Sequence, residues 1–283
     1  MLSWFSYKYY AQMLNLISTP IGNLDDISLR AIDVIKSSDY IYAEDTRSFK
    51  NILRSIKFEK SCKSFHEHNE DKVLNEIVEH VMNKKNVVLA CEAGTPAISD
   101  PGFKLIRKFV ELKLDYTLIP GPSSVINALV LSGLPTDQFS FYGFVPRKKN
   151  IQSKSFERIA TDVKTSIFFE STKRLKATIE NLSNYIEKSR KVSVCREMTK
   201  LHEQIVTDTC TNVIKEIEKG DLPLKGEIVL VIEGSKNTTY EINIDKKIKN
   251  EFLSKMSVSD AARLISLLTK ENKRDIYKIL NKP

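Results

Sequence analysis

Three charged clusters in this chain have the residue types needed to bind a charged ligand or to move a proton. They are residues 44–47 (Glu-Asp-Thr-Arg), 92–96 (Glu-Ala-Gly-Thr-Pro) and 196–200 (Arg-Glu-Met-Thr-Lys). The second cluster and residues 120–122 (Pro-Gly-Pro) also supply rigid turns with exposed backbone N–H and C=O groups. Such turns can hold a polar ligand closely, although each one taken alone is also typical of an ordinary loop.

Each cluster directly follows a short apolar run that has the composition of a β-strand. The strand-like runs are residues 14–18, 40–43, 87–91, 116–119, 166–169 and 192–195. In open α/β sheets, ligands bind beyond the carboxyl ends of the strands, so unusual loops at these positions are the expected walls of a site. The pattern therefore indicates an enzyme.

The length and composition of the chain limit its architecture. Its 283 residues suffice for two domains or one large one, and 41% hydrophobic with 28% charged residues is typical of a globular protein. No apolar run is long enough to span a bilayer, so we expect no membrane insertion. Residues 1–12 make a poor secretory signal and are interpreted as an N-terminal extension, with Met13 as an alternative translation start.

The cysteines and the net charge indicate the environment and the partner. Four cysteines without a CxxC pair are typical of free buried thiols in a reducing cytoplasm, where we expect the protein to work. A net charge of +8 favours a polyanionic partner such as nucleic acid. Basic residues gather at residues 147–149, 173–174 and 196–202, although enrichment in lysine also raises the charge without a functional cause.

Helical patterns alternate with the strand-like runs through about residue 133. The predicted helices cover residues 26–37, 71–82, 103–112 and 125–132. This alternation predicts an α/β fold with a mostly parallel sheet. Turn residues follow, and a second set of strands is expected at residues 139–144, 166–169, 192–196 and 227–233.

This pattern predicts two α/β domains, residues 13–125 and 126–235, and a helical appendage over residues 236–283. The appendage is polar at first and is then expected to form two helices, residues 259–268 and 274–280. Residues 257–260 resemble a helix cap. A DNA-reading helix-turn-helix is disfavoured because basic two-helix hairpins are common.

Several alternative kinds of site are absent or disfavoured in the sequence. Neither GxGxxG nor GxxxxGK[ST] occurs, which removes the usual sequence support for nicotinamide and ATP chemistry. His66 and His68 have no third ligand at a known spacing, so we expect no metal. The cluster at residues 44–47 also fits a helix cap with a solvated ion pair.

A longer series of motifs, in unbroken order from about residue 13 to 235, resembles the ribosomal RNA small subunit methyltransferase I family of the tetrapyrrole methylase superfamily. The motifs are residues 13–24, 43–47, 64–70, 92–102, 120–124, 132–137, 143–148, 169–171, 196–203 and 225–227. The resemblance implies two α/β domains of the tetrapyrrole methylase type with S-adenosylmethionine (SAM) in the cleft between them, and a homodimer. It also implies methylation of the ribose 2′-OH of a decoding-centre cytidine in the 16S rRNA of the small ribosomal subunit.

The chain departs from the family pattern at a few positions. Glu92 stands where the family usually has Asp, Ala97 where it has Gly, and Thr172-Lys173 where it has Pro-His. Glu92 keeps the charge with a longer reach, so the resemblance still implies a cofactor contact there. Thr172 and Lys173 change the shape expected for the loop of the second domain, although Lys173 can still meet a phosphate.

The chemistry of methyl transfer defines which side chains are needed. The displacement requires the acceptor oxygen, the methyl carbon and the sulfur in line, so positioning lowers the barrier by several kcal/mol. The cofactor carries the reactive group, and the protein binds and orients it. Because a ribose hydroxyl is a poor nucleophile near neutral pH, a base or a cation should lie beside it. The candidates at the strand ends are Lys200, Glu44, Asp45 and Arg47.

The resemblance also assigns binding residues by their position in the motifs. The implied cofactor contacts are Pro20, Glu92, Ile98, Ser99, Ser124, Val125, Phe169, Met198 and Gly226. The implied RNA contacts are Arg47, His66, His68, Arg147, Lys148 and Lys200. Two other functions remain open at this point: methylation of a tetrapyrrole or another small molecule, and a non-catalytic role in binding ribosomal RNA.

Overall fold

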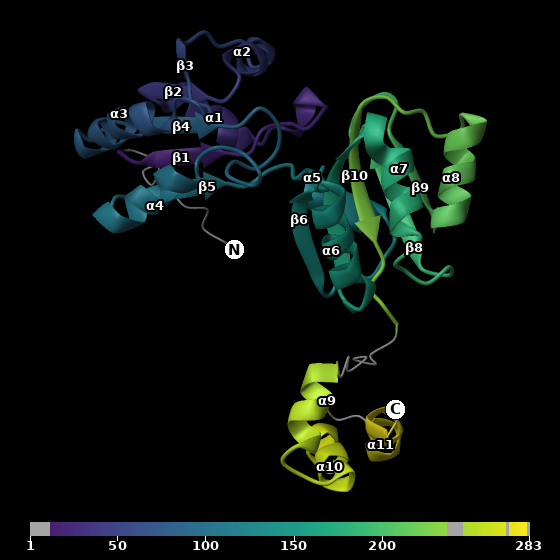
Figure 1. Ribbon diagram of the computed structural model, residues 1–283. Helices are drawn as coiled ribbons and strands as arrows, with labels where there is room; N and C mark the ends of the chain where they lie inside the picture. The colour runs from purple at the N-terminus through teal and green to yellow at the C-terminus, as the bar shows by residue number, and fades with distance from the viewer. Residues whose placement is uncertain (1–11, 237–245, 270–271, 282–283) are drawn as a thin grey trace, which may run out of the picture.

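A computed structural model describes residues 12–236, 246–269 and 272–281 (Figure 1). Two five-stranded sheets, one from each half of the chain, lie next to each other, and a separate group of helices follows at the carboxyl end. No helix among these residues has the length and apolar character needed to cross a membrane. The predicted N-terminal extension falls almost entirely outside the described residues.

The first sheet is parallel and carries helices on both faces. Its strands are β1 (Leu14–Ile17), β2 (Tyr40–Ala43), β3 (Cys62–Ser64), β4 (Val87–Ala90) and β5 (Tyr116–Ile119), in the order β3-β2-β4-β1-β5. The helices are η2 (Leu24–Asp26), α1 (Leu29–Ser37), α2 (Thr46–Ser55), α3 (Glu70–Met82) and α4 (Phe103–Leu112). Because every pairing is parallel, all five strands end at the same edge of the sheet.

Alternating strand side chains build the two cores of this sheet. Ile17 and Ala43 pack with α1 and α2 on one face. Leu16 and Tyr42 pack with α3 and α4 on the other face. The strands are therefore buried on both sides, as expected for a doubly wound parallel sheet.

The second sheet is mostly antiparallel. Its strands are β6 (Phe139–Phe144), β7 (Thr165–Ser171), β8 (Lys191–Arg196), β9 (Gln204–Thr209) and β10 (Glu227–Ile232), in the order β6-β7-β10-β8-β9, and only β6 pairs in parallel, with β7. Helices α6 (Lys149–Ala160), α7 (Thr172–Leu182) and α8 (Cys210–Lys219) cover the main core of this sheet.

Helix α5 (Ser124–Leu131) links the two sheets along the chain and packs on the second one. Its buried residues Val125, Ala128 and Leu129 join the cluster of Val229 and Val231 in β10. The chain thus leaves the first sheet at β5 and enters the second unit at the start of α5. This arrangement is consistent with the predicted domain boundary at residues 125–126, which stays a prediction.

The two helices predicted in the appendage are confirmed as α10 (Val258–Thr269) and α11 (Lys273–Asn281), but the described residues contain a third, α9 (Lys246–Leu253), that was not predicted. The three pack around Ala261, Ile265, Ile276 and Leu280. The predicted cap is confirmed, because the Ser257 hydroxyl oxygen accepts from the backbone N–H of Asp260 at 3.1 Å. Helix α9 escaped prediction because its sequence, Lys-Lys-Ile-Lys-Asn-Glu-Phe-Leu, is mostly polar.

The first predicted helix begins later than expected. Ser28 caps α1, because its hydroxyl oxygen accepts from the backbone N–H of Ala31 at 3.1 Å. Asp26, where the helix was predicted to begin, lies in the short helix η2, which Asn23 caps. The four cysteines are free, and three of them are buried, as the sequence predicts. Cys62, in the edge strand β3, is only partly buried.

Candidate active site

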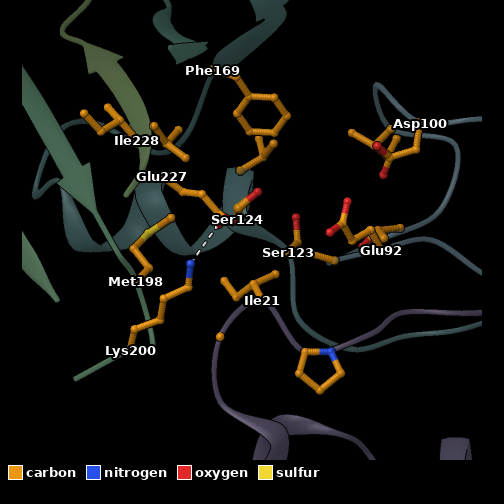
Figure 2. A pocket seen from close by; sticks show the side chains of 18 of the residues that line it. Ile21, Glu92, Asp100, Ser123, Ser124, Phe169, Met198, Lys200, Glu227 and Ile228 are labelled. Atoms are coloured by element: carbon orange, nitrogen blue, oxygen red, sulfur yellow. Dashed lines mark ion pairs between the residues drawn. The ribbon is translucent and has the colours of Figure 1, made fainter. Parts of the chain in front are cut away.

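A cavity of about 730 Å³ opens where the carboxyl edge of the first sheet meets the second sheet (Figure 2). From the first sheet it takes the loops after β1, β2, β4 and β5. From the second it takes the ends of β6 and β7, the loop after β8 and the start of β10. The residues that line it include Pro20, Ile21, Gly22, Glu44, Glu92, Ile98, Asp100, Ser123, Ser124, Val125, Phe169, Met198, Lys200, Gly226, Glu227 and Ile228.

Backbone pairing fixes the loops after β1 and β4 against each other. Thr19 and Gly94 exchange two backbone hydrogen bonds, at 2.9 and 3.0 Å. Gly94 has φ +83°, a left-handed conformation that favours glycine. The loop after β5 also approaches closely, since a Cβ on Gly121 would lie 3.0 Å from the Ser18 Cβ. These contacts hold Pro20 and Ile21 at the floor of the cavity.

One wall of the cavity is acidic. Glu44, Glu92 and Asp100 come from the loops after β2 and β4, and Figure 2 shows Glu92 and Asp100 on the same side. Burial, and then the neighbouring carboxylates of Asp45 and Glu44, raises the pKa of Glu92. Burial, and then the charge of Glu44, raises the pKa of Asp100 to about 6. Mutual repulsion of this kind is relieved by a bound cation, so this wall suits a positively charged group.

The loop between Glu92 and α4 has an unusual backbone. Ala97 and Ser99 both have φ +65°, although neither is glycine. Glu70 at the start of α3 is buried, and its carboxylate accepts from the backbone N–H of Gly102 at 3.1 Å. This hydrogen bond ties the far end of the loop to α3. The loop therefore presents Ile98 and Asp100 to the cavity in a fixed conformation.

The opposite wall is largely apolar. Ile21, Val125 and Met198 are buried, and Phe169 and Ile228 lie beside them. The Phe169 ring is supported edge-on by Phe141 and Phe144, with ring centroids at 4.9 and 5.3 Å. Figure 2 shows Ser123 and Ser124 between the apolar and acidic walls. A ligand with a flat apolar part and a cationic part fits such a cavity.

Lys200 brings a cation to the side of the cavity away from Glu92. Its Nζ lies 3.1 Å from Glu197 Oε1 and 3.2 Å from Glu227 Oε2, the latter drawn as a dashed line in Figure 2. Burial by itself lowers the pKa of Lys200, but the hydrogen bond to Glu197 and the charge of Glu227 outweigh it, and the net effect is a raised pKa. The ammonium stays protonated near neutral pH, so Lys200 supplies a positive charge there and does not act as a base.

The cavity brings together most of the predicted cofactor residues. Eight of the nine lie on its lining: Pro20, Glu92, Ile98, Ser124, Val125, Phe169, Met198 and Gly226. Ser99, in the loop with positive φ, is not among the lining residues.

The predicted catalytic residues divide into two pairs. Lys200 and Glu44 line the cavity, whereas Asp45 and Arg47 do not. The helix-cap interpretation of this cluster is confirmed for Asp45, whose carboxylate accepts from the backbone N–H of Arg47 at 2.7 Å and of Ser48 at 3.2 Å. These hydrogen bonds, from Ser48 first, lower the pKa of Asp45. Arg47 is exposed in the first turn of α2.

Most of the predicted RNA contacts do not line the cavity. His66 and His68 lie in the turn between β3 and α3, with ring centroids 5.9 Å apart. Arg147 and Lys148 precede α6, directly after β6. Of the six predicted residues only Lys200 is on the lining. Within residues 12–236, 246–269 and 272–281, no group of three or more His, Cys, Asp or Glu side chains is placed to hold a metal ion.

Sequence reasoning missed several lining residues. Asp100, Ser123 and Glu227 lie on the cavity, yet none was assigned a role. A signal existed for each, since all three fall inside motifs that carry the family resemblance. Ser48 and Asn51 were missed for a different reason. They belong to α2, a helix that was not predicted.

Comparisons with known proteins define the class to which this fold and site belong. The family of tetrapyrrole (corrin/porphyrin) methylases matches residues 13–214. A cobalamin biosynthetic enzyme, cobalt precorrin-4 methyltransferase, superposes with a TM-score of 0.58 at 15% identity, over 78% of this chain and 95% of that chain. Uroporphyrin-III C-methyltransferase from Thermus thermophilus gives a TM-score of 0.55 at 13% identity, over 78% and 94%. The chain has the fold of the tetrapyrrole methylases.

Sequence relatives define the family more narrowly. Proteins named ribosomal RNA small subunit methyltransferase I are similar to this chain over most of its length. The Bacillus subtilis protein is 34% identical over 96% of this chain and 95% of its own length. The Hydrogenobaculum protein is 40% identical over 81% and 98%, respectively. The chain belongs to the ribosomal RNA small subunit methyltransferase I family of tetrapyrrole methylases.

Proposed function

We propose that this protein transfers a methyl group from SAM to the ribose 2′-OH of a decoding-centre cytidine in the 16S rRNA of the small ribosomal subunit. The observation that carries the proposal is a cavity with an acidic and an apolar wall in a chain whose relatives are named for ribosomal RNA methylation. SAM has a positively charged sulfonium and ammonium and a flat adenine, so the chemistry of both walls fits it.

We assign different lining residues to different parts of the cofactor. Glu92 and Asp100 attract its positive charges, and a bound cation offsets the burial and then the repulsion that raise the pKa values of both carboxyl groups. Val125, Phe169 and Met198 pack against the adenine and the ribose. When bound, SAM supplies the activated methyl group. Ser99, off the lining, is proposed to act through the conformation of its loop.

Of the four candidate catalytic residues, only Lys200 and Glu44 line the cavity. We therefore assign the activation of the acceptor hydroxyl to these two. Lys200 places a permanent positive charge where the acceptor oxygen gains negative charge, and Glu44 is a carboxylate able to take a proton from the hydroxyl. Holding the acceptor and donor in line is worth about 7 kcal/mol or more of the barrier. Asp45 shapes the site by capping α2.

The RNA backbone is assigned to basic residues around the cavity. Arg147 and Lys148 follow β6, and Arg47 lies on α2 beside the acidic wall. Lysine and arginine bind phosphates regardless of base sequence, which fits a substrate recognised as a folded ribosomal subunit. His66 and His68 lie after the edge strand β3 and are assigned to the same surface. Such a substrate places the reaction in the cytoplasm.

We also propose that the protein works as a homodimer. β5 and β6 are edge strands of the two sheets, and α5 connects them along the chain. These elements expose apolar side chains, of which Val130 is 65% exposed. Further exposed apolar side chains on these elements are Tyr116, Leu118, Ile126, Leu131, Phe139 and Phe144. Unpaired strand edges and exposed apolar groups are features that a second copy of the chain covers.

The test is transfer of labelled methyl from SAM to small ribosomal subunits that lack the modification, followed by alkaline cleavage. Because a 2′-O-methyl group blocks cleavage at its own nucleotide, one protected cytidine is expected in the decoding region. Glu92→Gln is expected to weaken SAM binding about tenfold, and Glu157→Gln, exposed on α6, to leave it unchanged. SAM binding without label in RNA would redirect the proposal to a small-molecule acceptor.

A further inference from the structure

Glu197, directly after β8, binds the first residue of β10 through both its backbone and its side chain. Its backbone N–H donates to the carbonyl oxygen of Glu227 at 3.0 Å. Its carboxylate oxygen Oε1 accepts from the backbone N–H of Glu227 at 2.8 Å. The first bond extends the backbone pairing of β8 with β10 beyond Arg196 and Ile228, and the side-chain carboxylate takes the place of a second backbone acceptor. Together the two bonds fix the start of β10 relative to the loop that carries Lys200.

The same carboxylate oxygen also holds the lysine. Lys200 Nζ donates to Glu197 Oε1 at 3.1 Å, and the backbone N–H of Lys200 donates to the carbonyl oxygen of Glu197 at 3.0 Å. Gly226 leaves room for this arrangement, because a Cβ added there would overlap the Glu197 carboxyl group. Glycine also suits the φ of +87° at this position.

Glu197 itself is not on the cavity lining, although Lys200, Gly226 and Glu227 all are. Its backbone has φ +49°, a conformation that costs an L-residue about 1–2 kcal/mol. Its side chain is mostly buried, and the backbone N–H of Glu227 and then the Lys200 ammonium lower its pKa. An ionised carboxylate is thus held in a strained backbone position behind three lining residues. Strain of this kind persists where surrounding contacts enforce it.

We propose that Glu197 is a positioning residue that holds the Lys200 ammonium and the Gly226–Glu227 edge against the cavity without contacting either substrate. The role of Lys200 in methyl transfer rests on the proposed function, but the contact between Glu197 and Lys200 can be measured without RNA. Around the ammonium, the charged partners are Glu197 after β8 and Glu227 on β10. From the first sheet, the uncharged backbone of Gly22 packs on the lysine stem. Glu197 therefore provides one of the two negative charges that raise the pKa of this amine against the effect of burial.

The experiment measures the pKa of the Lys200 amine in the full-length protein. Lysine amines are converted to ¹³C-dimethylamines, their NMR shifts are titrated, and the Lys200 signal is assigned by its loss in Lys200→Arg. Glu197→Gln keeps an acceptor for the Glu227 N–H but loses the charge, so the Lys200 pKa is expected to fall by about one unit. The melting temperature near neutral pH should fall as well, because a carboxylate whose pKa is lowered in the fold stabilises it there. In the matched control, Glu203→Gln, the pKa is expected to stay the same. Glu203 lies on the same loop, where its carboxylate accepts from the Thr199 N–H at 2.7 Å.

Calorimetry with SAM tests whether Glu197 also holds the Gly226–Glu227 edge against the cavity. Glu197→Ala, which also loses the bond to the Glu227 N–H, is expected to bind SAM several-fold more weakly than Glu197→Gln. An unchanged Lys200 pKa in Glu197→Gln, or an equal shift in Glu203→Gln, would overturn the inference. If the pKa shift occurs in a protein that methylates no RNA, the positioning role stands and the proposed function fails.

Discussion

The backbone N–H of Asn23, after β1, donates a hydrogen bond to the hydroxyl oxygen of Thr199, after β8, at 3.2 Å. This contact joins a loop of the first sheet to a loop of the second beside the cavity. Gly22 lies at the same contact, where a Cβ would come within 2.5 Å of Lys200 Cγ and 2.8 Å of Thr199 Oγ1. The position of Lys200 therefore depends on the absence of a side chain at Gly22.

Gly22→Ala is expected to reduce turnover about 10- to 100-fold, because the added methyl group displaces the Lys200 stem. Gly22 does not have a positive φ, so alanine meets no backbone strain and the melting temperature should change little. Gly133→Ala is the control, since its Cβ meets no atom within 4 Å but its φ is +67°. It should lower stability by about 1 kcal/mol and leave turnover intact. Equal turnover in Gly22→Ala and the wild type would show that the function of Lys200 does not depend on the absence of a side chain at Gly22.

Asp100→Asn is expected to stabilise the protein above about pH 6 in the absence of SAM. The pKa of Asp100 is raised from 3.8 to about 6, so the folded state binds more protons than the unfolded state between these values. Stability due to this group therefore falls as pH rises through that window. After a discount for solvent screening, the gain is about 1 kcal/mol, or about 2–4 °C in melting temperature at about pH 8.

Thermal melts of Asp100→Asn at about pH 4 and pH 8 check this prediction, with the difference from the wild type vanishing at the lower pH. Asp208→Asn provides a control of opposite sign. Hydrogen bonds from Lys191 and then from the Thr209 N–H lower the pKa of Asp208, so this carboxylate stabilises the fold above its unfolded pKa. Its replacement should lower the melting temperature at about pH 8. A loss of stability in Asp100→Asn at the higher pH would contradict the acidic-wall account.

Replacing Arg147 and Lys148 with alanine is expected to weaken binding of the small subunit and to leave SAM affinity unchanged. If each side chain contacts one phosphate, the slope of log affinity against log salt should fall by about 0.7–0.9 per residue. Binding titrations over a range of salt measure this slope. Lys188→Ala with Lys215→Ala removes two exposed charges before β8 and on α8, and should leave the slope unchanged. Identical slopes in both double variants would remove Arg147 and Lys148 from the RNA surface.

Val130→Asp is expected to convert the protein to a monomer, because it places a charge on the exposed apolar side of α5. Sedimentation velocity measures the change. Val163→Asp, at another half-exposed valine just before β7, is the control and should leave the dimer intact. A wild-type protein that sediments as a monomer at micromolar concentration would refute the homodimer.

The strands and most helices could be predicted because each apolar run is bounded by glycine, proline or charged residues. β3 could not, since Cys62–Ser64 is a three-residue edge strand held by its pairing with β2 and has little apolar character. Helix α2 was missed even though Phe49, Ile52 and Leu53 have helical spacing, because the helix is otherwise polar. The alternating polar strand β9 depends in the same way on its partner β8.

The family motifs pointed to eight residues that line the cavity, since these residues lie at or near the ends of strands. That they contact a cofactor stays a prediction. The sequence could not show that the Glu197 carboxylate accepts hydrogen bonds from both the Lys200 ammonium and the backbone N–H of Glu227. Glu197 contacts Glu227, thirty residues later, only because β8 and β10 are antiparallel neighbours. Likewise, the pKa of Asp100 is raised first by burial in the cavity wall and then by the charge of Glu44, which comes from the loop after another strand.

The most direct test of the proposed function is mass spectrometry of nucleosides released from small-subunit RNA after incubation with the protein and labelled SAM. We expect the label in 2′-O-methylcytidine, at a level approaching one per subunit, and none when the RNA comes from subunits that already carry the modification. Label in a base-methylated cytidine would contradict the assignment of the ribose hydroxyl as acceptor. Absence of label from all nucleosides, with SAM bound, would contradict RNA as the substrate.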